Sequence, residues 1–264
     1  MVNPARTRLH PLLWGVIPMA NEKKVALVTG ANRGIGFETA RQLGQKGITV
    51  IVAARTKEAA EETAAKLKAE GLDVVPVKLD VTNTADRKAA AETVAAKFGK
   101  LDILINNAGI GAQGDMFELR ASATTEQELQ AVFGTNVFSV VGVTREFLPL
   151  LKKSDAGRIV NLSSILGSLT LHADPNSPIA AVKTFAYDGS KSALNAFTIH
   201  LAAELKGTKI KVNSAHPGWV KTDMGTDKAP MEIVDGAKTS VDLALIPQDG
   251  PNGRFIHMGQ ELPW

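Results

Sequence analysis

The sequence places a phenol and an ammonium group four residues apart. Tyr187, the only tyrosine in the chain, precedes Lys191 in a segment with helical spacing, so both side chains should project from one face of a helix. A phenol with a pKa of roughly 10 is a poor acid–base catalyst at neutral pH, and a neighbouring ammonium would lower that pKa. The pair therefore indicates acid–base chemistry, although Tyr-x-x-x-Lys alone is common by chance.

A glycine-rich turn is the second feature that suggests chemistry. Residues 29–36 read Thr-Gly-Ala-Asn-Arg-Gly-Ile-Gly and lie between an expected strand and an expected helix. Glycines permit a tight turn and close approach to a ligand, and free amides at the start of a helix attract negative charge. The segment predicts a pyrophosphate site. An ordinary strand-to-helix turn is the alternative interpretation of the glycines by themselves.

The end of the expected second strand indicates which dinucleotide is bound. A carboxylate there would bond the adenosine ribose of NAD and repel a 2′-phosphate, but this chain has two alanines followed by Arg55. Arg55, together with Arg33 of the glycine turn, could hold a 2′-phosphate by charge-assisted hydrogen bonds. We therefore predict NADP(H) as the cofactor. The alternative is that both arginines point into solvent.

Short β-branched apolar runs alternate with alanine-rich amphipathic segments from residue 24 onward. Strands are expected at 25–29, 49–53, 74–78, 101–105, 158–162, 209–214 and 254–257, and helices at 36–46, 57–70, 85–98, 136–152, 186–206 and 234–245. This alternation predicts one α/β domain over residues 21–264, a doubly wound Rossmann domain whose parallel sheet has about seven strands with helices on both faces. Residues 1–20 are interpreted as an N-terminal extension or misplaced start, with a cleaved targeting peptide as the alternative.

Polar and glycine residues gather where the expected strands end. Asn107 and Gly109 follow the fourth strand, Ser164 the fifth and Thr222 the sixth, while Asn136 opens the next helix. Open α/β sheets bind ligands at this edge. In order and content these motifs, with the glycine turn and the Tyr–Lys pair, resemble the short-chain dehydrogenase/reductase family from about residue 24 to the C-terminus. A longer stretch between Ser164 and Tyr187, and a tail with residues 235–237, 243–245 and Trp264, are similar to those of its carbonyl-reductase-like members.

The resemblance implies a role for each matched residue. Tyr187 would donate a proton to a substrate carbonyl, Lys191 would lower the pKa of Tyr187 and bond the nicotinamide ribose, and Ser164, rather than Ser163, would bond the carbonyl oxygen. Asn136 would hold a water of the proton relay. Asp80 would lie near the adenine, and Val220 and Thr222 near the carboxamide. The full set expected to bind the cofactor is Gly30, Asn32, Arg33, Gly34, Ile35, Gly36, Arg55, Asp80, Val81, Asn107, Ala108, Gly109, Tyr187, Lys191, Pro217, Gly218, Val220 and Thr222.

The implied activity is NADPH-dependent reduction of a carbonyl, in an aldehyde, ketone or quinone, to an alcohol by hydride transfer. Reduction of 3-ketoacyl groups and hydroxysteroid chemistry are variants within the same family. A non-catalytic module that senses NADP(H) is the alternative of a different class. Such a module has no need of Asn136, Ser164, Tyr187 and Lys191 together, so the enzyme is favoured.

The chain departs from the family between Ser164 and Tyr187, which are 23 residues apart, about ten more than in common members. The insertion, residues 169–185, contains prolines and turn-forming residues, which predict a surface loop at the mouth of the site. It would shape substrate access, unless it is a solvent loop with no selective role. We expect a homo-oligomer, dimer or tetramer, or a monomer if the insertion blocks packing.

Composition excludes several other classes of protein. Lys and Arg number 30 against 27 Asp and Glu, and their interspersed charges do not indicate nucleic-acid binding. The absence of cysteine excludes disulfides and thiolate metal sites, and the five histidines lack metal-binding spacing. No apolar run is long enough for a membrane helix. Composition thus predicts a protein of the cytoplasm that uses no metal. The substrate that the family resemblance implies is a small carbonyl compound.

Overall fold

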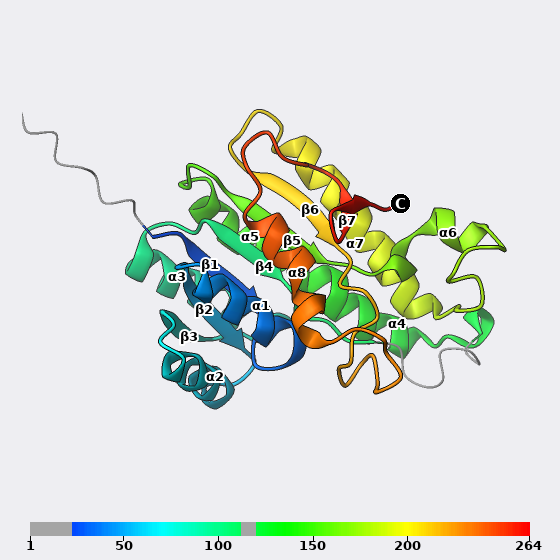
Figure 1. Cartoon of the computed structure of the whole chain (residues 1–264), viewed down its shortest axis with the longest axis horizontal. Helices are drawn as coiled ribbons and strands as arrows, with labels where there is room; N and C mark the ends of the chain where they lie inside the picture. Colours follow the sequence, from blue (N-terminus) through cyan, green and yellow to red (C-terminus); the bar gives the residue numbers. More distant parts are fainter. Residues whose placement is uncertain (1–22, 112–119) are drawn as a thin grey trace, which may run out of the picture.

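The computed structural model describes residues 23–111 and 120–264, so the predicted N-terminal extension, residues 1–20, lies outside the described residues. One sheet, in the strand order β3-β2-β1-β4-β5-β6-β7-β8, lies between two layers of helices (Figure 1). This architecture confirms the prediction of a doubly wound α/β domain with helices on both faces.

The first seven strands are parallel and match the expected runs to within two residues. They are β1 (Val25–Thr29), β2 (Thr49–Ala54), β3 (Val74–Lys78), β4 (Ile103–Asn106), β5 (Arg158–Leu162), β6 (Lys211–Ala215) and β7 (Phe255–His257). An eighth strand, β8 (Gln260–Glu261), pairs antiparallel with β7. Because both of its residues are exposed and it has no apolar pattern, the sequence did not predict it.

The helices follow the expected alternation, with two additions. They are α1 (Gly34–Gln45), α2 (Lys57–Ala69), α3 (Thr84–Phe98), α4 (Glu126–Phe133), α5 (Ser139–Leu151), α6 (Leu169–Ala173), α7 (Phe185–Glu204) and α8 (Ile233–Ala244), with short 3₁₀ turns η1 (Ala121–Ala123) and η3 (Ile165–Gly167). The sequence did not predict α4 or α6. A π-helical turn, η2 (Gly134–Phe138), joins α4 to α5, so Asn136 lies inside a continuous helical stretch instead of opening a helix as expected.

The strands are apolar on both faces because both faces are covered. Successive side chains of a strand point to opposite sides, so Val25 and Leu27 of β1 pack with α3, α5 and α7. Ala26 and Val28 pack on the other side with α1, α2 and α8. Such near-continuous apolar strands are typical of a parallel sheet buried between helix layers.

The strand order reverses direction between β1 and β4, which is where doubly wound sheets open a crevice. The Oγ1 of Thr29 at the end of β1 donates to the carbonyl of Ile105, at 3.2 Å, and accepts from the amides of Asn107 and Ala108, at 2.9 and 3.0 Å. One threonine hydroxyl therefore fixes the two strand ends that form the floor of the crevice.

The packing of α3 on α5 offers a test of the helix layer. A methyl group at Gly142 would lie 2.7 Å from Nε of buried Arg87, whose guanidinium is held by the carbonyl of Val81 and the hydroxyl of Thr84. We expect Gly142→Ala to lower the free energy of unfolding by about 1–3 kcal/mol through overpacking, measured by urea denaturation. Gly134→Ala is the control, because it has open space around it and helical dihedrals. Equal stability of the two variants would contradict this view of the contact.

Candidate active site

A crevice of about 1170 Å³ opens at the C-terminal edge of the sheet. It brings together most of the residues predicted to bind a dinucleotide. Those that line it are Gly30, Asn32, Arg33, Gly34, Ile35, Gly36, Arg55, Asp80, Val81, Asn107, Ala108, Gly109, Tyr187, Lys191, Pro217 and Thr222. Gly218 and Val220 are not in the lining. The Val220 side chain is buried against α8, where a methyl group at Gly236 would meet it at 2.6 Å.

The glycine turn forms a cradle with no room for a side chain at Gly30 or Gly36. Gly30 has a φ of +62°, and a Cβ at Gly36 would lie 2.4 Å from the Gly30 carbonyl oxygen. Helix α1 starts at Gly34, within the glycine turn, with no side-chain cap and no acidic residue in its first turn. Its free amides are therefore available to an anion. These features fit the pyrophosphate of a dinucleotide.

Asn107 lines the crevice, but its side chain is already engaged in holding the glycine turn. Its Nδ2 donates to the carbonyls of Thr29 and Gly30, at 2.8 and 3.2 Å. This side chain fixes the turn against the end of β4, and the next residues, Ala108 and Gly109, also line the crevice.

Two arginines stand at the end of the crevice predicted to hold a 2′-phosphate. Arg55 is exposed and has no acidic neighbour at the end of β2. The Nη1 of Arg33 lies 2.5 Å from Oδ2 of Asp223, across the mouth of the crevice, and both side chains are about three-quarters exposed. An ion pair this exposed is weak, so Arg33 can exchange Asp223 for a phosphate.

Tyr187 and Lys191 occupy successive turns at the start of α7, as the spacing predicts. The Lys191 Nζ lies 5.5 Å from the centroid of the phenol ring and donates to the Leu162 carbonyl at the end of β5, at 2.8 Å. Both side chains line the crevice, and Lys191 is 6% exposed. The phenol and the ammonium are thus neighbours at the rim of the glycine-lined space.

The ionisation of the pair differs from the expectation that the ammonium lowers the phenol pKa. Burial raises the pKa of Tyr187 to about 12, against a lowering by its hydrogen bond with Ser164, and the charge of Asp188 raises it further. Burial also lowers the pKa of Lys191 to about 8. Desolvation therefore outweighs the attraction between the two groups, and Tyr187 is a protonated phenol at neutral pH.

The geometry distinguishes the two serines at the end of β5. The Oγ of Ser163 donates to Oδ1 of buried Asn195 at 2.7 Å. The Oγ of Ser164 accepts from the amide of Leu166 at 3.2 Å and shares a hydrogen bond with the Tyr187 hydroxyl. The hydroxyl of Ser164 thus adjoins the phenol, while Ser163 and not Ser164 is among the residues that line the crevice.

Asn136 lies behind the crevice wall in the π-helical turn. Its Oδ1 accepts from the amide of Ile110, and its Nδ2 donates to the Ile110 carbonyl, both at 2.9 Å, and to Oγ of Ser190 at 3.0 Å. Asn136 Oδ1 and Lys191 Nζ both approach Gly109, at 3.1 and 3.7 Å from the position of an added Cβ. Asn136 is therefore close to the lysine, with a side chain largely occupied by protein partners.

Sequence reasoning missed the part played by His216, which it considered only as an improbable metal ligand. Its Nδ1 faces two backbone amides, those of Ile165 at 3.2 Å and Gly218 at 3.4 Å. Burial, with His257 nearby, lowers the pKa of His216 to about 3, so the neutral ring can accept. His216 joins the turn after Ser164 to the loop after β6. The only sequence signal is its position before Pro217 at the end of a strand.

The insertion between Ser164 and Tyr187 is partly helical instead of the expected loop. Helix α6 is capped by Ser168, whose Oγ accepts from the amide of Leu171 at 3.1 Å. The amide of Thr170 donates to the carbonyl of Trp264 at 2.9 Å, and the Trp264 ring stacks on Phe255 at 5.6 Å between centroids. The insertion is thus anchored to the last residues of the chain.

An open parallel sheet with a glycine cradle at the reversal of strand order, and a Tyr–Lys pair at its rim, defines a dinucleotide-binding domain of the Rossmann type. The family model of the short chain dehydrogenases matches residues 24–233. The chain belongs to this family.

Several known proteins resemble the chain over nearly all of its length. Mouse carbonyl reductase [NADPH] 1 is 32% identical, over 93% of this chain and 100% of the mouse protein. The crystal structure of NADPH-bound carbonyl reductase from chicken fatty liver has a TM-score of 0.79 and 30% identity, covering 92% of this chain and 99% of that one. Salutaridine reductase from Papaver somniferum has a TM-score of 0.76 and 32% identity, covering 88% and 99%.

Membrane-spanning helices and metal-binding clusters are both absent from the part of the chain that the structure describes. No helix among residues 23–111 and 120–264 is both long and apolar enough to cross a membrane. The same residues contain no group of three or more histidine, aspartate or glutamate side chains that could hold a metal ion.

The buried ammonium of Lys191 predicts a particular pH dependence of stability. Its pKa is about 8 when folded against an ordinary 10.5, so the unfolded chain binds more protons between these values. The resulting cost, on the order of 3 kcal/mol, is present below pH 8 and is relieved as pH rises toward 10.5. Relative to Lys191→Met, wild-type protein should therefore gain free energy of unfolding over this range, measured by denaturation at pH 7 and 10. A difference between the two proteins that does not change with pH would contradict the burial of the charge.

Proposed function

We propose that this chain is an NADPH-dependent reductase that converts the carbonyl of an aldehyde, ketone or quinone into an alcohol. The observation that carries the proposal is the position of Tyr187 and Lys191 together in the crevice that the glycine turn lines, with the Ser164 hydroxyl close enough to the phenol to lower its pKa. The similarity to mouse and chicken carbonyl reductases, whose names include NADPH, supports it.

The cofactor, when bound, supplies a hydride to the carbonyl carbon. Tyr187 then donates its proton to the oxygen as negative charge develops there, and its raised pKa keeps that proton in place at neutral pH until the oxyanion forms. The Oγ of Ser164 accepts from the Leu166 amide, and its proton, which bonds Tyr187 here, would turn to the same carbonyl oxygen when substrate is bound. The two hydroxyls together act as an oxyanion clamp.

Lys191 and Asn136 would support the phenol. One N–H of the ammonium is used by the Leu162 carbonyl, which leaves two for the nicotinamide ribose. Above its pKa of about 8, Lys191 loses the positive charge that would stabilise the phenolate of Tyr187 after proton transfer. Asn136 would hold the relay water near Lys191, for which its proximity to Gly109 is the supporting observation.

The remaining cofactor contacts follow from the crevice lining. Arg55 and Arg33 would grip the 2′-phosphate. Asp80, whose Oδ1 is used by the amide and hydroxyl of Thr82, would use its other oxygen near the adenine. Thr222 and the backbone of Val220 would contact the carboxamide. All the residues that the sequence predicts to contact the cofactor, from Gly30 to Thr222, are proposed to bind NADP(H).

Three broader predictions also stay proposals. Residues 1–20 would form an extension to a domain that spans 21–264, and the protein would reside in the cytoplasm. Association into a dimer or tetramer is supported by exposed apolar side chains, which are Phe138 of η2, Val141 of α5 and Ile199 of α7. Light scattering of the purified protein would decide between these and a monomer.

Removal of the proton donor tests the activity itself. We expect Tyr187→Phe to lose at least about a thousandfold in kcat, because the variant has no phenol to supply the proton, while it still binds NADPH. The measurement is the loss of NADPH absorbance with a panel of aldehydes, ketones and quinones, with NADPH fluorescence titration for binding. Undiminished turnover would overturn the role of Tyr187. A wild-type protein that binds NADPH without turnover would favour the sensing module.

Charge reversal at Arg55 tests the cofactor preference. Arg55→Asp should raise KM for NADPH at least about tenfold, since it removes a charge-assisted hydrogen bond and adds repulsion, and it should leave KM for NADH nearly unchanged. Lys57→Asp is a matched control, because Lys57 is an exposed cation on α2 close by and outside the crevice lining. Equal effects on the two cofactors would refute the assignment.

A further inference from the structure

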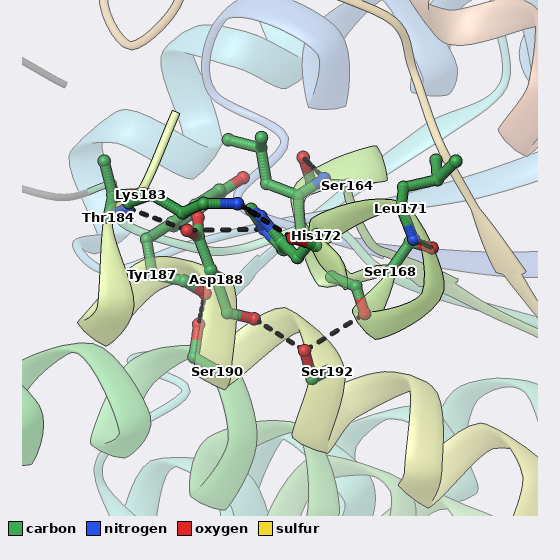
Figure 2. A network of polar contacts seen from close by, with 12 residues as sticks. Ser164, Ser168, Leu171, His172, Lys183, Thr184, Tyr187, Asp188, Ser190 and Ser192 are labelled. Carbon is green, nitrogen blue, oxygen red and sulfur yellow. Dashed lines mark hydrogen bonds and ion pairs between the residues drawn. The ribbon is translucent and has the colours of Figure 1, made fainter. Parts of the chain in front are cut away.

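The insertion reaches the catalytic helix at the residue next to Tyr187. Asp188 is 7% exposed, and both of its carboxylate oxygens accept from Thr184, Oδ1 from the hydroxyl at 2.6 Å and Oδ2 from the amide at 2.7 Å. The Nε2 of His172, from α6 of the insertion, lies 3.4 Å from the same Oδ2 (Figure 2). A carboxylate at the start of α7 is therefore shared between the helix and the insertion.

The partners of His172 define which ring nitrogen carries the proton. Its Nδ1 lies 3.0 Å from Nζ of Lys183, which also donates to the His172 carbonyl at 3.1 Å. An ammonium can only donate, so Nδ1 accepts and the proton is on Nε2. Nε2 lies 3.0 Å from the Leu166 carbonyl as well as facing Asp188. One imidazole N–H thus points between two acceptors.

These two acceptors belong to the two turns that hold the reacting hydroxyls. The amide of Leu166 donates to Oγ of Ser164 at 3.2 Å, and Asp188 follows Tyr187 directly. Figure 2 shows His172 and Lys183 between the turn that carries Ser164 and the first turn of α7. The imidazole is therefore one residue away from the phenol on one side and two residues away from the serine on the other.

We propose that His172 is a positioning residue that fixes Ser164 relative to Tyr187, with Lys183 and Asp188 orienting its ring. The inference rests on the proposed function and gives the insertion a second role besides shaping access to the site. Each of the two hydroxyls must lie within hydrogen-bond reach of one carbonyl oxygen, and an error of 1 Å in such a constellation costs up to about a hundredfold in rate.

Other contacts hold the η3 turn against the first turns of α7 but do not position the hydroxyls of Ser164 and Tyr187. The Oγ of Ser192 lies 3.0 Å from the carbonyl oxygens of both Gly167 and Asp188 and shares its one proton between them, and Ser192 is not among the residues that line the crevice. The turns therefore stay packed when His172 is replaced. Loss of the imidazole should change the alignment of the hydroxyls and leave the fold intact.

The kinetic test compares His172→Leu with His172→Gln. The glutamine amide can place an N–H donor near the position of Nε2, whereas leucine cannot. We expect His172→Leu to lower kcat for reduction of 4-nitrobenzaldehyde by NADPH about tenfold, the value of one hydrogen bond to an ionised partner, with KM for NADPH unchanged, and His172→Gln to recover most of the loss. Ser177→Ala is the control within the insertion, because Ser177 Oγ bonds only the Leu171 carbonyl, and it should keep wild-type kcat.

A double-mutant cycle separates positioning from a general structural effect. If His172 acts through Ser164, His172→Leu should have no further effect on kcat in a Ser164→Ala background. Equal losses in both backgrounds, or equal kcat in His172→Leu and wild-type protein, would overturn the proposal.

A second readout does not depend on turnover. The chain has a single tyrosine, so protein labelled with ¹³C at the ring Cζ of tyrosine gives one resonance, whose position reports the hydrogen bond at the phenol. We expect this resonance to shift in His172→Leu and to stay at its wild-type position in His172→Gln and Ser177→Ala. An unchanged resonance in His172→Leu would overturn the positioning role. A shifted resonance in a protein that reduces no carbonyl would instead overturn the proposed function alone.

Discussion

The close packing of the η3 turn on α7 is the contact on which the site depends. Gly167 ends this turn, and an added Cβ there would lie 2.8 Å from the backbone carbon of Lys191 and 2.9 Å from its Cβ. Only glycine allows the turn to approach the helix this closely. The approach brings the end of β5 against the first turns of α7, so a serine, a phenol and an ammonium from segments 23 residues apart or more share one small volume.

Desolvation dominates the electrostatics of this volume. It raises the pKa of Tyr187 to about 12, lowers that of Lys191 to about 8 and lowers that of His216 to about 3. Each shift favours the neutral form of the group. Burial likewise raises the pKa of the Asp188 carboxyl next to the phenol, against the hydrogen bonds from the Thr184 hydroxyl and amide that lower it. Attraction between Tyr187 and Lys191, which the sequence emphasised, is secondary in the cofactor-free protein.

Most of the fold could be predicted because its signals are local. The β-branched runs of β1, β3 and β5 were predicted to the residue, and the glycine turn needs only its neighbours to be interpreted. The π-helical turn around Asn136 could not be predicted, since it arises where α4 runs into α5 and depends on their packing. The contacts of His172 and His216 were also beyond sequence reasoning. The His216 ring faces backbone amides, which carry no residue-type signal, and His172 meets Asp188 and Lys183 only through the fold of the insertion.

The anchoring of Thr170 by the Trp264 carbonyl has a practical consequence for anyone handling this protein. A purification tag fused after Trp264 would leave from beside the insertion, and a bulky one could pull the stacked indole off Phe255. Affinity tags are better attached ahead of residue 23. Strand β1 starts at Val25, and its N-terminal end lies at the end of the sheet opposite the crevice.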